Sequence, residues 1–253
     1  MTDAKPKHKG FYILPNIFTT ASLFCGFLGI MWAISGRFEH SALAILASAL
    51  LDGLDGKVAR LTNSQSDFGV QFDSLSDLVA FGVSPAITIF LWNTHHFGRL
   101  GFLASFLLMA CAALRLARFN VQVHCVSKKY FIGMPTPASA CTLALLILVA
   151  PYFPEELLET VLPVVTLVMV YALSFLMVSR VRYLSFKDMA MVRAHPFTST
   201  VTMILLFVLV ATEPKILGFL CFLGYMISGL VYTFVIFPLR RSQQLRSPSR
   251  ELS

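Results

Sequence analysis

The chain has 253 residues, of which 57% are hydrophobic and 13% are charged, and its mean hydropathy is +0.74. This composition excludes an ordinary soluble domain and indicates an integral membrane protein. A formal net charge of +7 could suggest a nucleic-acid partner. Membrane proteins, however, collect Lys and Arg in their cytoplasmic loops, and this explains the charge, so we predict no nucleic-acid partner.

Apolar stretches long enough to cross a bilayer as helices recur along the chain. We predict eight spans, at residues 11–35, 39–60, 69–92, 98–118, 133–151, 160–180, 196–212 and 215–238. The connections between them are short, which favours one compact bundle. The predicted fold is therefore an all-α, polytopic membrane helix bundle. Residues 11–238 form its single transmembrane domain, between a short segment (1–10) and a basic tail (239–253).

Lys and Arg set the orientation of this predicted topology. Eight spans place both termini on one side of the membrane, together with 17 of the 20 Lys and Arg residues. The opposite side receives only Arg37, Arg99 and Lys215. Both termini are therefore expected in the cytoplasm, and the acidic stretch Pro154–Glu159 is expected in a loop on the other side.

An unusual set of acids lies where the second and third predicted spans meet. Asp52 and Asp55 are three residues apart near the end of one span, and Asp73 and Asp77 are four apart near the start of the next. Both spacings place a pair on one face of a helix. Carboxylates beside apolar runs are costly unless cations offset them, and hard divalent ions suit such oxygens. We therefore predict a metal site open to the cytoplasm, with Asp67 merely solvated in the polar link between the spans.

Small and basic residues accompany these aspartates. Gly56, Ala59 and Gly69 would let a bulky ligand approach the backbone, and Arg60 offers donors for phosphate. Taken alone, the spacing from Gly53 to Gly56 is more typical of helix packing, and a lone intramembrane Asp is more typical of helix pairing or proton relay. Four acids with interleaved small residues and an Arg favour the metal site.

The pattern Asp52-x2-Asp55-Gly56-x2-Ala59-Arg60-x8-Gly69-x3-Asp73-x3-Asp77 resembles the complete signature of the CDP-alcohol phosphatidyltransferase family. The resemblance implies a CDP-linked lipid donor, usually CDP-diacylglycerol. It implies that an alcohol attacks the phosphorus attached to the lipid and that CMP leaves. A homodimer working among membrane lipids is also implied.

The same resemblance assigns roles to the signature residues. Asp52, Asp55 and Asp73 would be ligands of divalent metals, with two ions of Mg²⁺ or Mn²⁺ expected. Asp77 would be the general base for the incoming hydroxyl and would also touch a metal. The four remaining signature residues would line the pocket for the nucleotide and phosphates: Gly56, Ala59, Arg60 and Gly69.

Further segments resemble bacterial members of this family that use L-serine as the acceptor. They are Leu14–Thr19, Leu61–Phe68, Phe81–Pro85, Ala113–Asn120 and Phe131–Pro137. The resemblance implies a phospholipid-synthesising transferase in the bacterial cytoplasmic membrane, with its active site facing the cytoplasm. In the first segment, Asn16 and Thr19 could hydrogen-bond the donor or cap the helix.

A serine acceptor brings a carboxylate, which suits the guanidinium fork of an Arg. Arg118 and Asn120, at the cytoplasmic end of the fourth predicted span, are the candidate serine-binding residues. Arg115 is three residues before Arg118 and can share its face, but anchoring at the membrane surface explains either Arg as well as substrate contact does. Pro135 and Pro137 are expected to set the start of the fifth helix.

Two alternatives stay open. The first keeps the donor but uses another alcohol, such as glycerol 3-phosphate, inositol phosphate or choline. A phosphorylated acceptor would need a denser basic pocket than Arg118 and Asn120 supply. The second is a cation transporter whose Asp cage lies on a conduction path, which predicts acids distributed through the membrane depth.

Overall fold

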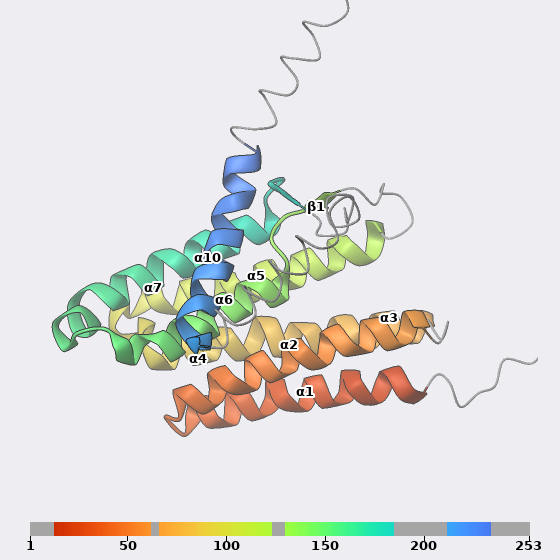
Figure 1. Cartoon of the computed structure of the whole chain (residues 1–253), viewed down its shortest axis with the longest axis horizontal. Coiled ribbons are helices and arrows are strands. Elements are labelled where there is room, and N and C mark those ends of the chain that lie inside the picture. Colours follow the sequence, from red (N-terminus) through yellow and green to blue (C-terminus); the bar gives the residue numbers. More distant parts are fainter. Residues whose placement is uncertain (1–12, 62–65, 123–129, 185–211, 234–253) are drawn as a thin grey trace, which may run out of the picture.

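The computed structural model describes residues 13–61, 66–122, 130–184 and 212–233 (Figure 1). The first two helices, α1 (Ile13–Ile34) and α2 (Phe38–Leu61), pack along each other. Their contact is made by small polar residues: the Ser22 and Ser48 hydroxyls lie 2.7 Å apart and are buried. Lipid gives apolar side chains little reason to associate, so such close contacts through small residues hold helices together in a membrane.

The third predicted span is one continuous helical rod of three parts. It consists of α3 (Asp67–Asp77), a π-helical segment η2 (Leu78–Val83) and α4 (Ser84–Trp92). The rod begins at Ser66, whose hydroxyl accepts a hydrogen bond of 3.0 Å from the Gly69 amide. Such an N-cap satisfies one of the free amides of the first turn. The helix therefore starts at Asp67, which is its exposed first residue and not part of the preceding link as predicted.

The core surrounds α6 (Thr136–Val149), in which every residue from Ala138 to Val149 is buried. A helix that is apolar on all faces is suited to such a central position. As predicted, prolines set its start: Pro135 is the N-cap and Pro137 lies in the first turn. The short segment η4 (Ala150–Tyr152) continues it.

Two long helices flank this core, α5 (Arg99–Gln122) and α7 (Glu155–Val178). The short turn η3 (Thr94–Phe97) leads into α5. The prediction of an acidic loop before α7 was wrong, because Glu155 and Glu156 form the first turn of the helix itself. Acids are stabilised there by the positive end of the helix dipole.

One short strand pair lies where the segment before α6 meets the end of α7. Strand β1 (Tyr130–Ile132) pairs antiparallel with β2 (Arg182–Leu184). Gly133 follows β1 with φ of +79°, and a Cβ there would collide with the Met177 carbonyl oxygen. Only glycine fits this turn, because both the conformation and the space exclude a side chain.

The last described helix, α10 (Pro214–Val231), crosses α6 (Figure 1). Within the described part of the chain, five helices are long and apolar enough to cross a membrane: Asn16–Ile34, Asp67–Trp92, Arg99–Val121, Glu155–Val178 and Pro214–Val231. The all-α membrane bundle is thus confirmed. Helices also cover the predicted span 39–60 and the part of the predicted span 133–151 that follows Pro135, whereas residues 196–211 of the predicted span 196–212 lie outside the described residues.

Candidate metal site

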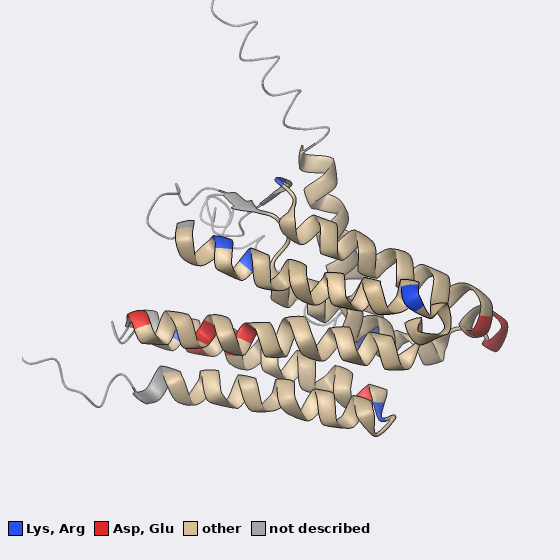
Figure 2. Cartoon of the chain, turned by 180° about the vertical axis from the view of Figure 1, so that it is seen from behind, with Lys and Arg blue, Asp and Glu red and all other residues tan. Residues whose placement is uncertain are grey.

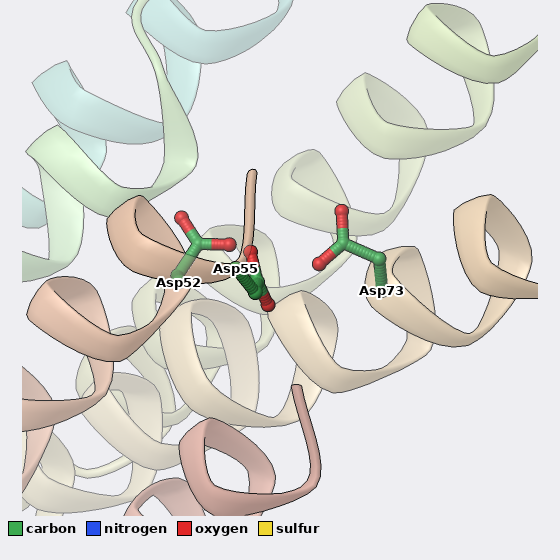
Figure 3. A group of neighbouring side chains, drawn as sticks. All are labelled: Asp52, Asp55 and Asp73. Atoms are coloured by element: carbon green, nitrogen blue, oxygen red, sulfur yellow. The ribbon is translucent and has the colours of Figure 1, made fainter. Parts of the chain in front are cut away.

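The cytoplasm-facing end predicted from the sequence is where α2 ends and α3 begins. Three predicted ligands converge there: Asp52 and Asp55 from α2, and Asp73 from α3 (Figure 3). One carboxylate oxygen from each lies within 4.8 Å of the other two. Three negative charges so close repel one another strongly in a medium of low dielectric. A divalent cation bound by oxygen ligands would offset that repulsion, so the donor set fits Mg²⁺ or Mn²⁺.

Asp55 is the most deeply placed of the three, with 5% of its surface exposed. The Thr19 hydroxyl of α1 donates a hydrogen bond of 3.0 Å to its carboxylate. The Thr19 carbonyl in turn accepts a bond of 3.1 Å from the Ser76 hydroxyl of α3. A polar group of α1 therefore orients one predicted ligand and ties α1 to the helix that carries the third. Support of this kind fixes the direction in which a metal-binding carboxylate points.

Asp77 lies one helical turn beyond Asp73, at the end of α3. Its carboxyl is a hydrogen-bonding neighbour of Asp52 and interacts electrostatically with Asp73. The π-helical segment starts at the next residue, Leu78. Segments of this type occur often at functional sites, since the wider turn changes the direction of the residues around it. All four predicted aspartates thus lie in one group.

The glycines near the four aspartates differ in their surroundings. A Cβ placed on Gly53 or Gly56 would meet no atom within 4 Å, so neither glycine is required for helix packing among the described residues. The space beside Gly56 is therefore open, and the prediction that Gly56 lines the donor pocket stays a prediction. A Cβ on Gly69 would lie 3.1 Å from the Ser66 hydroxyl, so this glycine serves the cap of α3. Ala59 and Arg60 belong to α2, but their side chains lie outside what the structure describes.

The predicted serine-binding residues lie at the end of α5, next to α3. The Asn120 amide nitrogen donates to the Ser74 hydroxyl at 3.0 Å and to Gln71 at 3.3 Å. Asn120 therefore joins α5 to α3, one residue from Asp73. Arg118 is half-buried. Its role, like that of Asn120 in binding serine, stays a prediction.

Two residues near the aspartates make contacts that were not predicted from the sequence. Thr19 was expected to contact the donor or cap a helix, but it binds Asp55. Arg115 was paired with Arg118 on spacing alone, yet its guanidinium donates to the Thr136 hydroxyl at 3.3 Å and interacts electrostatically with Asp77. For Thr19, the resemblance of the segment Leu14–Thr19 to the family was a sequence signal. No sequence signal distinguished Arg115 from Arg118.

The chain is similar to several known proteins. A protein from Helicobacter pylori named CDP-diacylglycerol–serine O-phosphatidyltransferase is 42% identical over 176 residues, which cover 70% of this chain and 73% of the relative. A Bacillus subtilis protein of the same name is 30% identical over 177 residues, covering 70% of this chain and 93% of the relative. The archaetidylserine synthase of Methanothermobacter thermautotrophicus is 34% identical over 179 residues, covering 70% and 72%.

The family model described as CDP-alcohol phosphatidyltransferase matches residues 12–178. This range contains every signature residue from Asp52 to Asp77 and the helices that position them. The resemblance seen in the sequence is therefore confirmed: the chain belongs to the CDP-alcohol phosphatidyltransferase family.

Proposed function

We propose that this protein transfers the phosphatidyl group of CDP-diacylglycerol to the hydroxyl of L-serine, giving phosphatidylserine and CMP in a reaction that depends on a divalent metal. The convergence of Asp52, Asp55 and Asp73 carries the proposal, because a diphosphate donor needs its charge neutralised where it reacts. These three residues would hold Mg²⁺ or Mn²⁺. When bound, the metal neutralises the diphosphate and makes its phosphorus more electrophilic.

The chain itself would position the donor around this metal site. The open space beside Gly56 admits the nucleotide and diphosphate close to the α2 backbone. Arg60, on the same helix, is proposed to bind phosphate oxygens, and Ala59 and Gly69 to complete the pocket lining. The acyl chains of the donor would stay in the surrounding lipid, since the apolar surfaces of the helices continue from the site into the bilayer.

Asp77 is proposed as the general base. Its carboxylate accepts the proton of the serine hydroxyl as that oxygen bonds to the phosphorus carrying the lipid. The bond from this phosphorus to the oxygen shared with the CMP phosphate breaks, and CMP leaves with the bonding electron pair. Displacement at phosphorus depends mainly on positioning and charge neutralisation, so a base one turn beyond Asp73 is sufficient protein chemistry.

Serine is proposed as the acceptor on the names of the relatives. Two bacterial relatives are named for serine and CDP-diacylglycerol, and an archaeal relative is named for archaetidylserine, so the serine moiety is common to names that differ in the lipid. A bacterial cytoplasmic membrane and a site facing the cytoplasm are proposed with it, because both serine and the CDP-lipid would be reached from that side. Two metal ions and a homodimer stay predictions.

The test is an acceptor panel with the purified full chain in detergent. CDP-diacylglycerol is offered with L-serine, glycerol 3-phosphate, inositol phosphate or choline, at graded Mg²⁺ or Mn²⁺ and after EDTA. We expect CMP release only with serine and metal, with phosphatidylserine as the lipid product by mass spectrometry. Release driven by another alcohol would replace serine as the acceptor. Undiminished release after EDTA would contradict the metal site.

A further inference from the structure

Two buried polar atoms have no hydrogen-bond partner among the described residues: Arg115 Nε, whose guanidinium interacts electrostatically with Asp77, and Ser139 Oγ on α6. Leaving such a group without a partner costs free energy, and more so when the group is charged. The other end of the Arg115 guanidinium donates to the Thr136 hydroxyl at 3.3 Å. Thr136 and Ser139 are three residues apart on α6, so both project from one face of its first turn. The unmatched polar atoms thus lie on two helices, α5 and α6, which the hydrogen bond from Arg115 to Thr136 joins.

The contact between α5 and η2 places Arg115 at this depth. A Cβ on Gly82 would lie 3.2 Å from the Ala112 Cβ, so the two segments approach closely there. They run in opposite directions, and Arg115 lies one turn beyond Ala112 toward the aspartate end. One turn from Gly82 in the same direction leads to Asp77. The guanidinium and the proposed base are therefore neighbours, in agreement with the electrostatic interaction between them.

The first turn of α6 adds to the positive character of this position. Its N-cap is Pro135, whose side chain makes no capping hydrogen bond. The start of an α-helix carries a partial positive charge that favours an anion. One guanidinium, one helix start and two hydroxyls make a small site with a single full positive charge. That charge matches a carboxylate better than a doubly charged phosphate monoester.

We propose that Arg115, with Thr136 and Ser139 at the start of α6, binds the carboxylate of an amino-acid acceptor. This inference rests on the proposed function and makes it more specific. Serine is short enough for its hydroxyl to face Asp77 while its carboxylate is held by the guanidinium. Tyr225 of α10 interacts electrostatically with Arg115 and lies outside the family-matched residues 12–178.

The competing site is one turn nearer the end of α5, at Arg118 and Asn120. There the Asn120 side chain is already bonded to Ser74 and Gln71, which leaves it fewer groups for a ligand. Arg115, by contrast, has a buried donor without a partner among the described residues. These facts favour Arg115 as the residue that recognises the acceptor.

The experiment compares L-serine with ethanolamine, which is serine without its carboxylate. For Arg115→Gln we expect the KM for serine to rise by about 10- to 100-fold, as the loss of a charged hydrogen bond implies, while the KM for CDP-diacylglycerol is unchanged. The preference for serine over ethanolamine should fall by the same factor. Arg115→Lys should restore part of it, and Ser139→Ala should raise the KM for serine by about 3- to 10-fold.

Arg99→Gln is the matched control, because it removes the same charge from the exposed opposite end of α5 and should leave both KM values unchanged. Equilibrium binding of radiolabelled serine gives a readout that does not depend on turnover, and it should weaken in parallel. A normal serine KM in folded Arg115→Gln would overturn the inference, as would loss of serine preference in Arg118→Gln alone. Absence of serine-dependent CMP release in the unmutated protein would overturn the proposed function as well. The unmutated protein therefore tests the proposed function, and the variants test the role of Arg115.

Discussion

The Asp55 carboxylate shows how much a single side chain decides in this site. It is buried, and it accepts a hydrogen bond from the hydroxyl of Thr19, which lies on a different helix. Burial of a carboxylate is tolerated when hydrogen bonds and cations compensate it. Thr19 supplies a hydrogen bond and orients the Asp55 carboxylate as a bound cation would need. The roles of Asp55 and Thr19 are therefore coupled.

Replacing Thr19 by valine keeps the shape of the side chain but removes the donor. We expect the Mg²⁺ or Mn²⁺ concentration needed for half-maximal CMP release to rise about 10- to 100-fold, as for other residues that orient metal ligands. The neighbouring Thr20→Val is the matched control, since the exposed Thr20 hydroxyl bonds only to the Asn16 carbonyl in the described structure. An unchanged metal requirement in Thr19→Val would show that Asp55 needs no such support.

Asp73 and Asp67 lie on the same helix, α3, and allow a proposed metal ligand to be compared with an exposed acid. Asp73→Asn should lower CMP release by at least about 10²- to 10³-fold, because it removes a charge from the group that would neutralise the diphosphate. Asp67→Asn should retain normal activity, since Asp67 is exposed at the start of α3. Both variants should elute as folded protein in size-exclusion chromatography. Substantial activity in folded Asp73→Asn would contradict the metal-site assignment.

At the scale of the elements, the site depends on how closely α1 approaches the helical rod formed by α3, η2 and α4. A Cβ on Gly26 of α1 would lie 2.7 Å from the Ala80 Cα, so the two helices touch at the η2 segment. The same segment begins immediately after Asp77. The position of α1 against η2 is thus linked to the positions of Thr19 and Asp77, which lie one to two turns away on these elements.

Gly26→Ala tests this contact. We expect it to lower the free energy of unfolding by about 1–3 kcal/mol through overpacking, seen as a lower thermal midpoint in detergent. Trp32 in α1 and Trp92 in α4 are the chain's two tryptophans, so their fluorescence reports on this helix pair. The control is Gly224→Ala in α10, where a Cβ meets no atom within 4 Å and stability should be unchanged or higher by up to about 1 kcal/mol. Equal midpoints for both variants would contradict the close approach.

At the scale of the whole molecule, charge is collected at the two ends of the bundle (Figure 2). Among the described residues, the acids form two groups. One lies at the proposed active end (Asp52, Asp55, Asp67, Asp73, Asp77), and the other lies at the far end (Glu39, Glu155, Glu156, Glu159, Glu213). No described acid lies midway between them. A conduction path across the membrane would require such groups, so this distribution disfavours the cation transporter.

The orientation predicts which exposed positions can be labelled from outside a cell. With the five native cysteines replaced by alanine, Arg37→Cys should react with a membrane-impermeant maleimide in intact bacteria. Asp67→Cys should react only after permeabilisation. Both residues are exposed, so accessibility within the protein does not separate them. Labelling of Asp67→Cys in intact cells would reverse the predicted orientation.

The sequence was sufficient for the features that depend on local composition and spacing. Apolar lengths predicted the membrane helices, and the spacing from Asp52 to Asp77 predicted a carboxylate group and the family. These properties follow from helix geometry and from the cost of unpaired charge in lipid, both of which act along one or two neighbouring segments. The N-cap was less visible in the sequence: the Gly69 amide donates a hydrogen bond to the Ser66 hydroxyl, and α3 starts at Asp67, two residues before the predicted start of the span.

Tertiary structure alone decided the contacts between distant segments. The π-helical turn after Asp77 leaves no mark in the hydrophobic pattern, and the bond from Thr19 to Asp55 joins residues 36 positions apart. Spacing allowed Arg115 and Arg118 to share a face. Only the packing of α5 against η2 and the hydrogen bond from Arg115 to Thr136 distinguish Arg115 as the residue beside Asp77. Helical periodicity fixes which residues lie on the same face of one helix, whereas the close approach of small residues on several helices fixes which faces meet.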